Sequence, residues 1–182
     1  MTIRKILVYP EYKQELRQKS EVVQQINPKV RMLIRDLKDT LRSSDDGIGL
    51  AAPQINFYLQ VVIVCLGTEV EGKWEAGPPR ALINPSILLA EDDRKDYDGC
   101  LSFPGLYGET IRPHRLRVTG QNEDGLPFDE LFEGFNAVVV HHEIDHLQGI
   151  LFIDRAKSVD DLYTLEKNEY GAWVRRPVDA GF

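Results

Sequence analysis

The stretch that most constrains this chain is Phe135 to Phe152, FNAVVVHHEIDHLQGILF. It contains the pattern H-E-x-x-H, in which His142 and His146 are four residues apart. Four residues of an α-helix turn through about 400°, so the two imidazoles lie on one face, one turn apart. Two imidazoles at this separation can bind a single metal ion, and Glu143 beside them can act on a water molecule at that ion.

Apolar residues surround the pattern on most sides of the predicted helix. Val138 and Val139 share a row with the two histidines, and Val140 and Ile144 belong to a second apolar row. A helix that is apolar on most sides is normally buried, and burying imidazoles and carboxylates without partners is costly. A bound metal ion offsets that cost. On a surface helix the same pattern would be solvated, which the apolar context argues against.

Size and composition predict one soluble domain spanning residues 1–182. The chain has 182 residues, a net charge of −7 and no long basic run, so we expect no direct sequence-specific binding of nucleic acid. No apolar run reaches the length of a membrane span, and the first residues lack a secretory apolar region. Two cysteines make no disulfide framework, which predicts a reducing, cytoplasmic location without a membrane partner.

The clearest helix outside the central stretch begins at Asn27-Pro28 and ends near Ser43. Asn can cap a helix and Pro suits its first position, and apolar residues then recur on one face. The tail, residues 157–182, is expected to hold a short helix over Val159 to Asn168. We expect the rest, Gly171 to Phe182, to be poorly ordered because it is rich in Gly, Pro and charge.

Several segments have the composition of strands. Leu59 to Leu66 is rich in β-branched residues and predicts a buried strand, and Ala81 to Leu89 predicts another, made irregular by Asn84-Pro85. Thr68 to Pro79 is expected to be a Gly/Pro-rich loop. Residues 115–121 and 126–133 flank a turn sequence and predict a β-hairpin directly before the central helix.

The identity of a third metal ligand decides the chemistry. Catalytic sites of the zinc type usually have three protein ligands and leave one position for water. His141 adjoins His142 but points about 100° away on a helix, so it is a poor co-ligand. Cys100, which lies between turn formers, would give a Cys/His/His site. A later glutamate, Glu166 or Glu169, would instead give a zinc endopeptidase.

A third reading is a binding protein without catalytic activity that retains a structural metal. Structural sites are usually closed by four protein ligands, so a fourth ligand in place of water would favour this reading.

Three uncommon segments occur together in one order: GIGLAAPQ at 47–54, DGCLS at 98–102 and HEIDH at 142–146. In this combination the chain resembles the peptide deformylases, from its first apolar residues to about Asp154-Arg155. The resemblance implies an α+β fold in which antiparallel β-sheets pack around a central metal-binding helix. It also implies a hydrolase that removes the formyl group from N-formylmethionyl nascent polypeptides.

The resemblance implies a role for each matching residue. Three ligands hold the metal ion with water in the fourth position: Cys100, His142 and His146. Glu143 acts as general base and then general acid, and Gln54 and the Leu101 backbone N–H stabilise the oxyanion. Residues that line the substrate backbone or the methionine pocket are Ile48, Gly49, Leu50, Phe135, Val138 and Val139, with the His142 ring.

The resemblance also implies the cofactor and the partners. Ferrous iron is expected natively, and zinc, nickel or cobalt fit the same donors in preparations. The expected partners are formylmethionyl nascent chains and, transiently, the ribosome.

Departures from the family pattern carry their own expectations. Asp98 stands where the family usually has Glu, and we expect the shorter carboxylate to make a looser local bond. Phe103 replaces a smaller aliphatic residue, and Tyr107 lies where many members have Arg. Asp145 is a carboxylate on a buried helix and needs a partner, so we predict that it pairs with Arg112 and helps to orient the helix.

Overall fold

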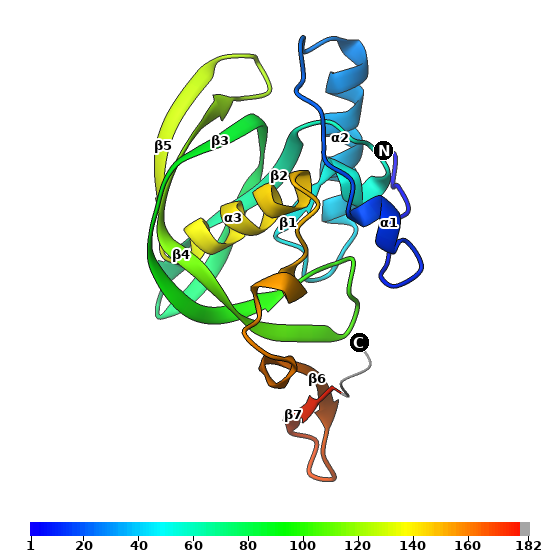
Figure 1. Cartoon of the computed structure of the whole chain (residues 1–182), viewed down its shortest axis with the longest axis vertical. Helices are drawn as coiled ribbons and strands as arrows, with labels where there is room; N and C mark the ends of the chain where they lie inside the picture. The colour runs from blue at the N-terminus through cyan, green and yellow to red at the C-terminus, as the bar shows by residue number, and fades with distance from the viewer. Residues whose placement is uncertain (179–182) are drawn as a thin grey trace.

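The chain is built on a bent antiparallel sheet. The computed structural model describes residues 1–178 of the chain. Within this range the strand order is β1-β2-β3-β4-β6-β7, with β5 paired to β4, and every strand pairing is antiparallel. Figure 1 shows β3 and β4 curving around the central helix α3. The strands are β1 Gly49–Ala51, β2 Val61–Val70, β3 Lys73–Gly99, β4 Leu106–Gln121, β5 Pro127–Glu133, β6 Leu162–Lys167 and β7 Trp173–Pro177.

Two longer α-helices pack against this sheet, and single turns complete the fold. The α-helices are α1 Lys13–Leu16, α2 Pro28–Arg42 and α3 Phe135–Leu147. The 3-10 turns are η1 Ala52–Ile55, η2 Phe152–Arg155 and η3 Val159–Asp161. This arrangement of few helices and an antiparallel sheet around α3 confirms the α+β fold class predicted from the sequence.

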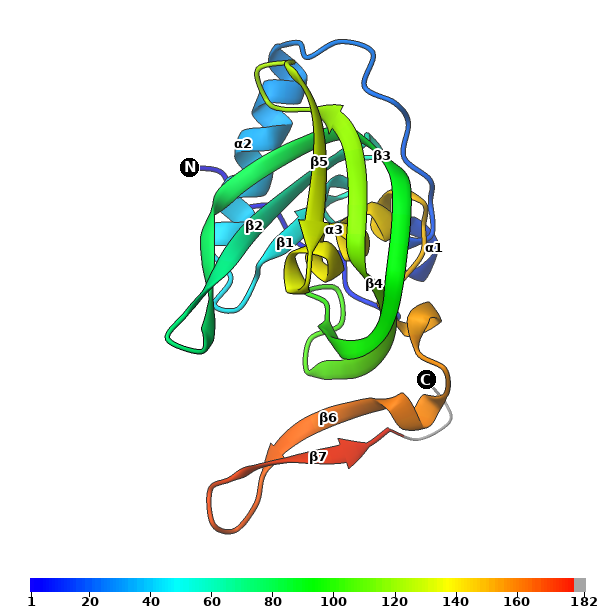
Figure 2. The same cartoon turned by 90° about the vertical axis from the view of Figure 1, so that its left-hand side faces the viewer.

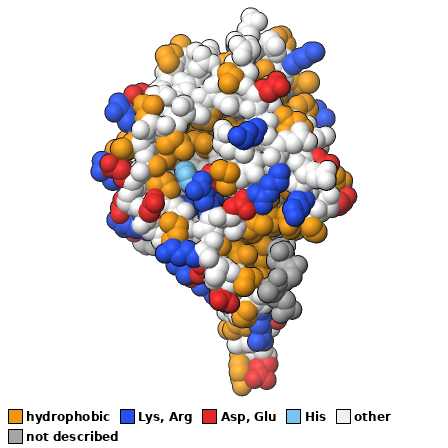
Figure 3. All heavy atoms as spheres, viewed as in Figure 1, with side chains coloured by type: hydrophobic (Ala, Val, Ile, Leu, Met, Phe, Trp, Pro, Cys, Tyr) orange, Lys and Arg blue, Asp and Glu red, His pale blue; other side chains and the backbone are white. Residues whose placement is uncertain are grey.

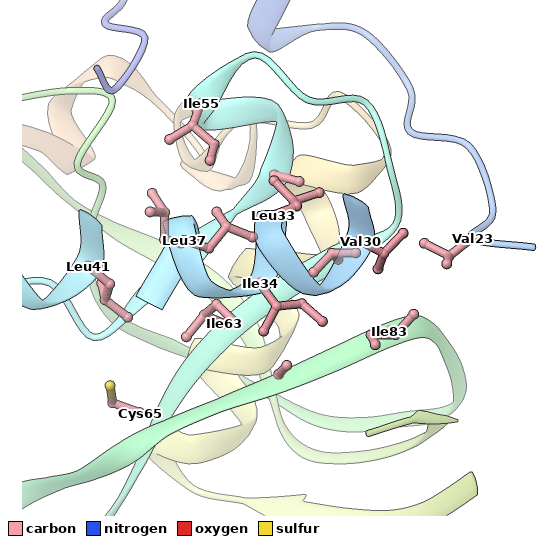
Figure 4. Packing of buried hydrophobic residues seen from close by; sticks show 14 residues of the cluster. Val23, Val30, Leu33, Ile34, Leu37, Leu41, Ile55, Ile63, Cys65 and Ile83 are labelled. Atoms are coloured by element: carbon pink, nitrogen blue, oxygen red, sulfur yellow. The ribbon is translucent and has the colours of Figure 1, made fainter. Parts of the chain in front are cut away.

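Strand β2 lies between α2 and α3, which explains its continuous apolar run. Val61, Ile63 and Cys65 belong to the cluster that packs against α2, as Figure 4 shows for Ile63 and Cys65. The alternate residues, Val62 and Val64, belong to the cluster around α3. Successive side chains of a strand point to opposite faces, so a strand covered on both faces is apolar throughout.

Helix α3 is buried almost all round, as its composition predicts. Eleven residues from Ala137 to Leu147 are buried, including both histidines, Glu143 and Asp145. Its apolar side chains pack against β2, β4 and β5 in one cluster. The helix therefore carries its polar pattern into the interior, where its orientation is fixed by packing.

Helix α2 begins as predicted. The Asn27 side chain accepts hydrogen bonds from the backbone N–H groups of Lys29 and Val30, and Pro28 occupies the first helical position. The helix buries Leu33, Ile34, Leu37 and their neighbours against β2 and β3 (Figure 4).

The predicted hairpin is confirmed, but the predicted loop at 68–79 is wrong. Strands β4 and β5 pair from Arg115 opposite Glu133 to Gln121 opposite Pro127. Residues 68–79 are mostly strand, because Val70 pairs directly with Lys73 across a two-residue turn. Glu71 and Gly72 both have positive φ, as a tight hairpin turn requires. The irregularity predicted at Asn84-Pro85 is present as a register shift between Ile83 and Ser86.

The predicted helix at 159–168 is also wrong beyond its first turn. Residues 159–161 form η3, and β6 and β7 then make a hairpin that projects from the body as an arm (Figures 1 and 2). The segment forms a strand instead of a helix because Tyr163 and Thr164 pair with the first residues of β4. Within the tail for which poor order is predicted, residues 173–177 form β7, and residues 179–182 lie outside the described part of the chain.

Among residues 1–178, no helix has the length and apolar character needed to cross a membrane.

The α2 interface gives a direct test of this packing. Leu37 is fully buried, whereas Met32 on the same helix is 42% exposed. We expect Leu37→Ala to lower the free energy of unfolding by about 2 to 5 kcal/mol because it leaves a cavity. Met32→Ala should cost less than about 1 kcal/mol. Urea unfolding of both variants measures the difference, and equal losses would contradict the packing described here.

Candidate metal centre

Three potential metal ligands meet at one point. His142 and His146 come from α3, and Cys100 follows the last residue of β3. One donor atom from each residue lies within 4.8 Å of the other two, and Cys100 Sγ is 3.3 Å from His146 Nε2. Among the described residues this is the one cluster of three or more His, Cys, Asp or Glu donors that could hold a metal ion.

The turn after β3 brings Cys100 to the helix. Strand β3 pairs with β4 up to Gly99 opposite Tyr107, and the chain then reverses. The Phe103 N–H donates to the Cys100 carbonyl at 2.8 Å, and Gly105 has a φ of +78°, which suits glycine. Phe103 is buried and stacks on Tyr9 with ring centroids 4.8 Å apart, so the larger residue fills the core below the turn.

The shorter carboxylate at Asp98 does not loosen its bonds, and that expectation is wrong. Asp98 Oδ1 lies 2.7 Å from His142 Nδ1, and Oδ2 accepts from Thr110 and from Arg112, each at 2.8 Å. Burial opposes ionisation of this carboxyl, but His142 and Arg112 outweigh it and lower the pKa of Asp98 well below its usual value. Asp98 therefore orients the His142 ring, whose Nε2 is left for the cluster.

Arg112 joins the two halves of the site, as its predicted pairing with Asp145 requires. Its guanidinium is fully buried and donates to Asp98 at 2.8 Å and to Asp145 at 2.7 Å. Arg155 adds two further bonds to Asp145, at 3.0 and 2.6 Å. The Arg112–Asp145 pair is thus confirmed, and it connects the end of β3 with α3 through one cation.

His141 lies outside the ligand cluster, as its direction on the helix predicts. Its Nδ1 lies 2.8 Å from an Arg112 nitrogen. Burial lowers the pKa of His141 to about 4. A neutral ring can accept from the guanidinium, so His141 adds an acceptor to the Arg112 network.

The two histidines of the cluster differ in their surroundings. Burial lowers the pKa of His146 to about 3, which keeps this imidazole neutral and able to act as a ligand. Burial acts the same way on His142, but the contacts with Asp98 and Cys100 outweigh it and raise the pKa of His142. A cation at the cluster competes with that proton, because a metal ligand must be deprotonated.

Glu143 lies buried beside the cluster with one oxygen unused. Its Oε2 has no hydrogen-bond partner in the described structure, and burial raises the pKa of the carboxyl to about 7. Gly49 approaches so closely that a Cβ atom there would overlap the Glu143 carboxylate. The residue is therefore held in a fixed position, with a free acceptor at the site.

Gln54 is also fixed at the site. Its Oε1 accepts from the Ala51 N–H at 2.8 Å, so its Nε2 faces Ser102 Oγ at 3.1 Å and Cys100 Sγ at 3.5 Å. The Leu101 backbone N–H donates no hydrogen bond to the described part of the chain. The Gln54 amide therefore donates to Ser102 and toward the thiol, whereas the Leu101 N–H, on the residue after the thiol, is unused.

These groups open into a cavity of about 360 Å³. Its lining includes all but one of the predicted substrate residues, namely Ile48, Gly49, Phe135, Val138 and Val139. Leu50 is the exception, because its side chain is fully buried in the α2 cluster. Trp74 packs edge-on against Phe135 with centroids 5.1 Å apart and supports this wall.

Sequence reasoning did not identify every residue at the site. It assigned no role to Ser102 or Thr110, both fully buried, or to the contact between Asp98 and His142. The signal for Ser102 was its place two residues after Cys100 in DGCLS. Thr110 had no local signal, because its role depends on the register that places β4 beside β3.

The Arg112 network generates a stability prediction. Arg112→Met removes the cation and leaves two buried carboxylates poorly compensated, so we expect a loss of about 3 to 5 kcal/mol in the free energy of unfolding. Arg117→Met is the matched control, since Arg117 pairs with Asp129 at the surface and should lose only a small fraction of that amount. Urea unfolding of both variants measures the two losses in the free energy of unfolding. A loss for Arg112→Met no larger than that for Arg117→Met would contradict the bridging role of Arg112.

A family model and curated relatives match most of the chain. The family model described as polypeptide deformylase matches residues 3–161. A peptide deformylase of Aquifex aeolicus is 41% identical over 166 residues, covering 91% of this chain and 94% of that protein.

Solved structures have the same fold. A peptide deformylase from Ehrlichia chaffeensis in complex with actinonin is 30% identical with a TM-score of 0.77, covering 87% of this chain and 91% of its own. A class I type b peptide deformylase from Acinetobacter baumannii, bound to Met-Ala-Ser, is 26% identical with a TM-score of 0.76 and coverages of 85% and 98%. The chain therefore belongs to the polypeptide deformylase family.

Proposed function

We propose that this member of the family hydrolyses the N-terminal formyl group of formylmethionyl peptides, with Cys100, His142 and His146 as the protein ligands of one divalent ion. The observation that carries this assignment is the meeting of a thiol and two imidazoles within 4.8 Å, beside the unpartnered carboxylate oxygen of Glu143. The family is one of metal-dependent hydrolases, and the donor set fits such an ion.

A divalent ion bound by these donors supplies Lewis acidity toward a carbonyl oxygen and makes a water molecule more acidic. We assign ferrous iron as the native ion on the resemblance, and zinc, nickel and cobalt suit the same ligands. Three protein donors in the cluster support a catalytic site, since a structural site would be closed by a fourth.

Glu143 is the proposed general base and acid. Its free Oε2 can accept a proton from the attacking water, and a pKa raised to about 7 lets the same carboxyl donate that proton to the leaving amine. Because Gly49 has no side chain, its backbone can approach the Glu143 carboxylate closely. This close packing restricts the orientation of the carboxylate.

Gln54 and Leu101 are the proposed oxyanion donors. Attack on the formyl carbon places negative charge on its oxygen, and the Gln54 Nε2 and the Leu101 N–H can both donate to it. Hydrogen bonds with Ala51 and Ser102 fix the orientation of the Gln54 amide, so it needs no reorganisation during the reaction. Its removal typically costs about 10² to 10³ in rate.

The apolar part of the cavity is the proposed methionine pocket. A thioether side chain is flexible and suits an apolar pocket of irregular shape. The residues that form it are Ile48, Phe135, Val138, Val139 and the ring of His142. The Met-Ala-Ser bound to the Acinetobacter baumannii protein is a peptide that begins with this residue.

The endopeptidase alternative receives no support from the arm. Glu166 is part of β6, is well exposed and pairs with Arg176 at 3.3 Å, and it does not belong to the ligand cluster. Glu169 lies between β6 and β7. A metal site that used either glutamate would have to draw it away from this hairpin.

The proposed setting follows from the substrate. Formylmethionyl chains emerge during protein synthesis, so we place the enzyme in the cytoplasm, in transient contact with the ribosome. This part of the proposal rests on the family resemblance.

The test is anaerobic hydrolysis of formyl-Met-Ala-Ser with added ferrous iron. Glu143→Gln keeps the size of the side chain but removes the base, so we expect kcat to fall by about 10² to 10⁴ while the bound iron stays at the wild-type level. Glu166→Gln is the control and should keep both. Wild-type protein that holds metal yet releases no formate would refute the assignment.

A further inference from the structure

The hairpin of β2 and β3 is attached to the first turn of α3 by one side chain. Asn136 Oδ1 accepts from the Gly67 N–H at 2.9 Å, and Asn136 Nδ2 donates to the Gly67 carbonyl at 2.9 Å. The register of β2 and β3 shifts at this point, between Cys65 and Gly67. Asn136 therefore fixes the hairpin where its own ladder is irregular. Figure 2 shows the end of this hairpin as a loop at the lower left of the body.

Trp74 connects this hairpin to the wall of the substrate cavity. A Cβ atom at Gly67 would overlap the Trp74 ring, so the ring lies directly on the backbone at that position. The same ring packs edge-on against Phe135, with centroids 5.1 Å apart and an angle of 87° between the planes. Of these two described side chains, Phe135 lines the cavity and Trp74 does not. Trp74 therefore supports Phe135 from outside the cavity.

Strand β2 also holds Ile48, another residue of the proposed methionine pocket. The Cys65 N–H donates to the Ile48 carbonyl at 2.8 Å, and β1 continues this pairing with Gly49 opposite Val64. Ile48 and Phe135 both line the cavity. Two residues of the pocket are thus attached to nearby positions of one strand, Ile48 directly and Phe135 through the hairpin contacts. The separation of these residues consequently depends on β2.

Phe135 needs such support because of its place on α3. It is the first residue of the helix, and Gly134 before it has no side chain to cap the helix. An uncapped first turn is held less firmly than a helix interior. A pocket discriminates between apolar side chains only while its wall stays in place, since a surface that can repack accepts several shapes. The contacts of Trp74 and Asn136 supply the restraint that the helix end lacks.

We propose that Trp74 and Asn136 are positioning residues that determine the side-chain selectivity of the enzyme. They hold Phe135 in place, so the pocket accepts a slender, unbranched thioether and rejects a bulkier aromatic side chain. The inference rests on the proposed function, because the first residue of a formyl peptide must enter this pocket. Neither residue belongs to the metal cluster, and both act through Phe135.

The aromatic contact bounds the size of the effect. An edge-on aromatic pair contributes an amount that corresponds to roughly 2- to 12-fold in an equilibrium constant. Trp74→Ala removes this contact and leaves space into which the Phe135 ring can withdraw. A peptide that begins with phenylalanine gains from that space, whereas a methionine peptide loses part of its packing. We therefore expect the Met/Phe ratio of kcat/KM to fall at least about threefold.

The experiment measures kcat/KM for formyl-Met-Ala-Ser and formyl-Phe-Ala-Ser with iron-loaded, full-length protein under anaerobic conditions. The wild type should favour the methionine peptide by about 10-fold or more, as a rigid apolar pocket does for side chains of different size. Trp74→Ala and Asn136→Ala should each lower this ratio at least about threefold. Trp74→Phe keeps an aromatic ring against Phe135 and should keep most of the ratio.

Two matched controls come from the arm, which Figure 3 shows as a narrow projection from the body. Trp173→Ala changes the other tryptophan of the chain, which is 65% exposed. Asn168→Ala removes an amide that, like Asn136, bonds the backbone, since Asn168 Oδ1 accepts from the N–H groups of Tyr170 and Ala172. Both controls should keep the wild-type ratio. A general defect in folding lowers kcat/KM for both peptides together and leaves the ratio unchanged.

A wild-type ratio below about 10 would overturn the inference, because the pocket would then have no selectivity to maintain. A ratio that falls by less than about threefold in either Trp74→Ala or Asn136→Ala would overturn it as well. Failure of the proposed function is a different result, because the metal-loaded wild type would then hydrolyse neither peptide.

Discussion

One buried cation holds the two halves of the site together. Arg112 bonds Asp98, two residues before Cys100, and Asp145, the residue before His146. The segment that carries the thiol and the helix that carries the imidazoles are therefore bound to the same guanidinium. A buried arginine is costly to desolvate and is tolerated here because acceptors surround it. Its position on β4, between β3 and α3, makes the geometry of the cluster a consequence of strand register.

The packing around α3 gives this network its rigidity. The helix is buried on nearly all sides, and β2 lies between it and α2 with apolar side chains on both faces. Side chains in such an interior occupy fixed positions, so Glu143 and the imidazoles are held close to one geometry. The same burial raises the pKa of Glu143 to about 7 and lowers that of His146 to about 3. The environment that fixes these groups therefore also sets their protonation.

Sequence patterns predicted the parts of the fold that depend on local signals. The capped start of α2, the burial of α3, the β4–β5 hairpin and the Arg112–Asp145 pair are all present. Patterns failed where pairing with distant strands decides the structure. The first part of the arm was expected to be helical. Instead, its Tyr163 pairs with Tyr107 of β4, a residue much earlier in the chain. The side chain of Asp98 was expected to make a looser bond than a glutamate would. That expectation failed because the distance from Asp98 to His142 is set by tertiary packing.

The central claim is that the Cys100 sulfur completes a metal site with His142 and His146. Cobalt(II) replaces the native ion in such sites, and a thiolate ligand produces a sulfur-to-cobalt charge-transfer absorption. This absorption should be present in cobalt-loaded wild-type protein and in Cys65→Ser, which changes the other, buried thiol. It should disappear in Cys100→Ser. An absorption that persists without Cys100, or depends on Cys65, would contradict the account.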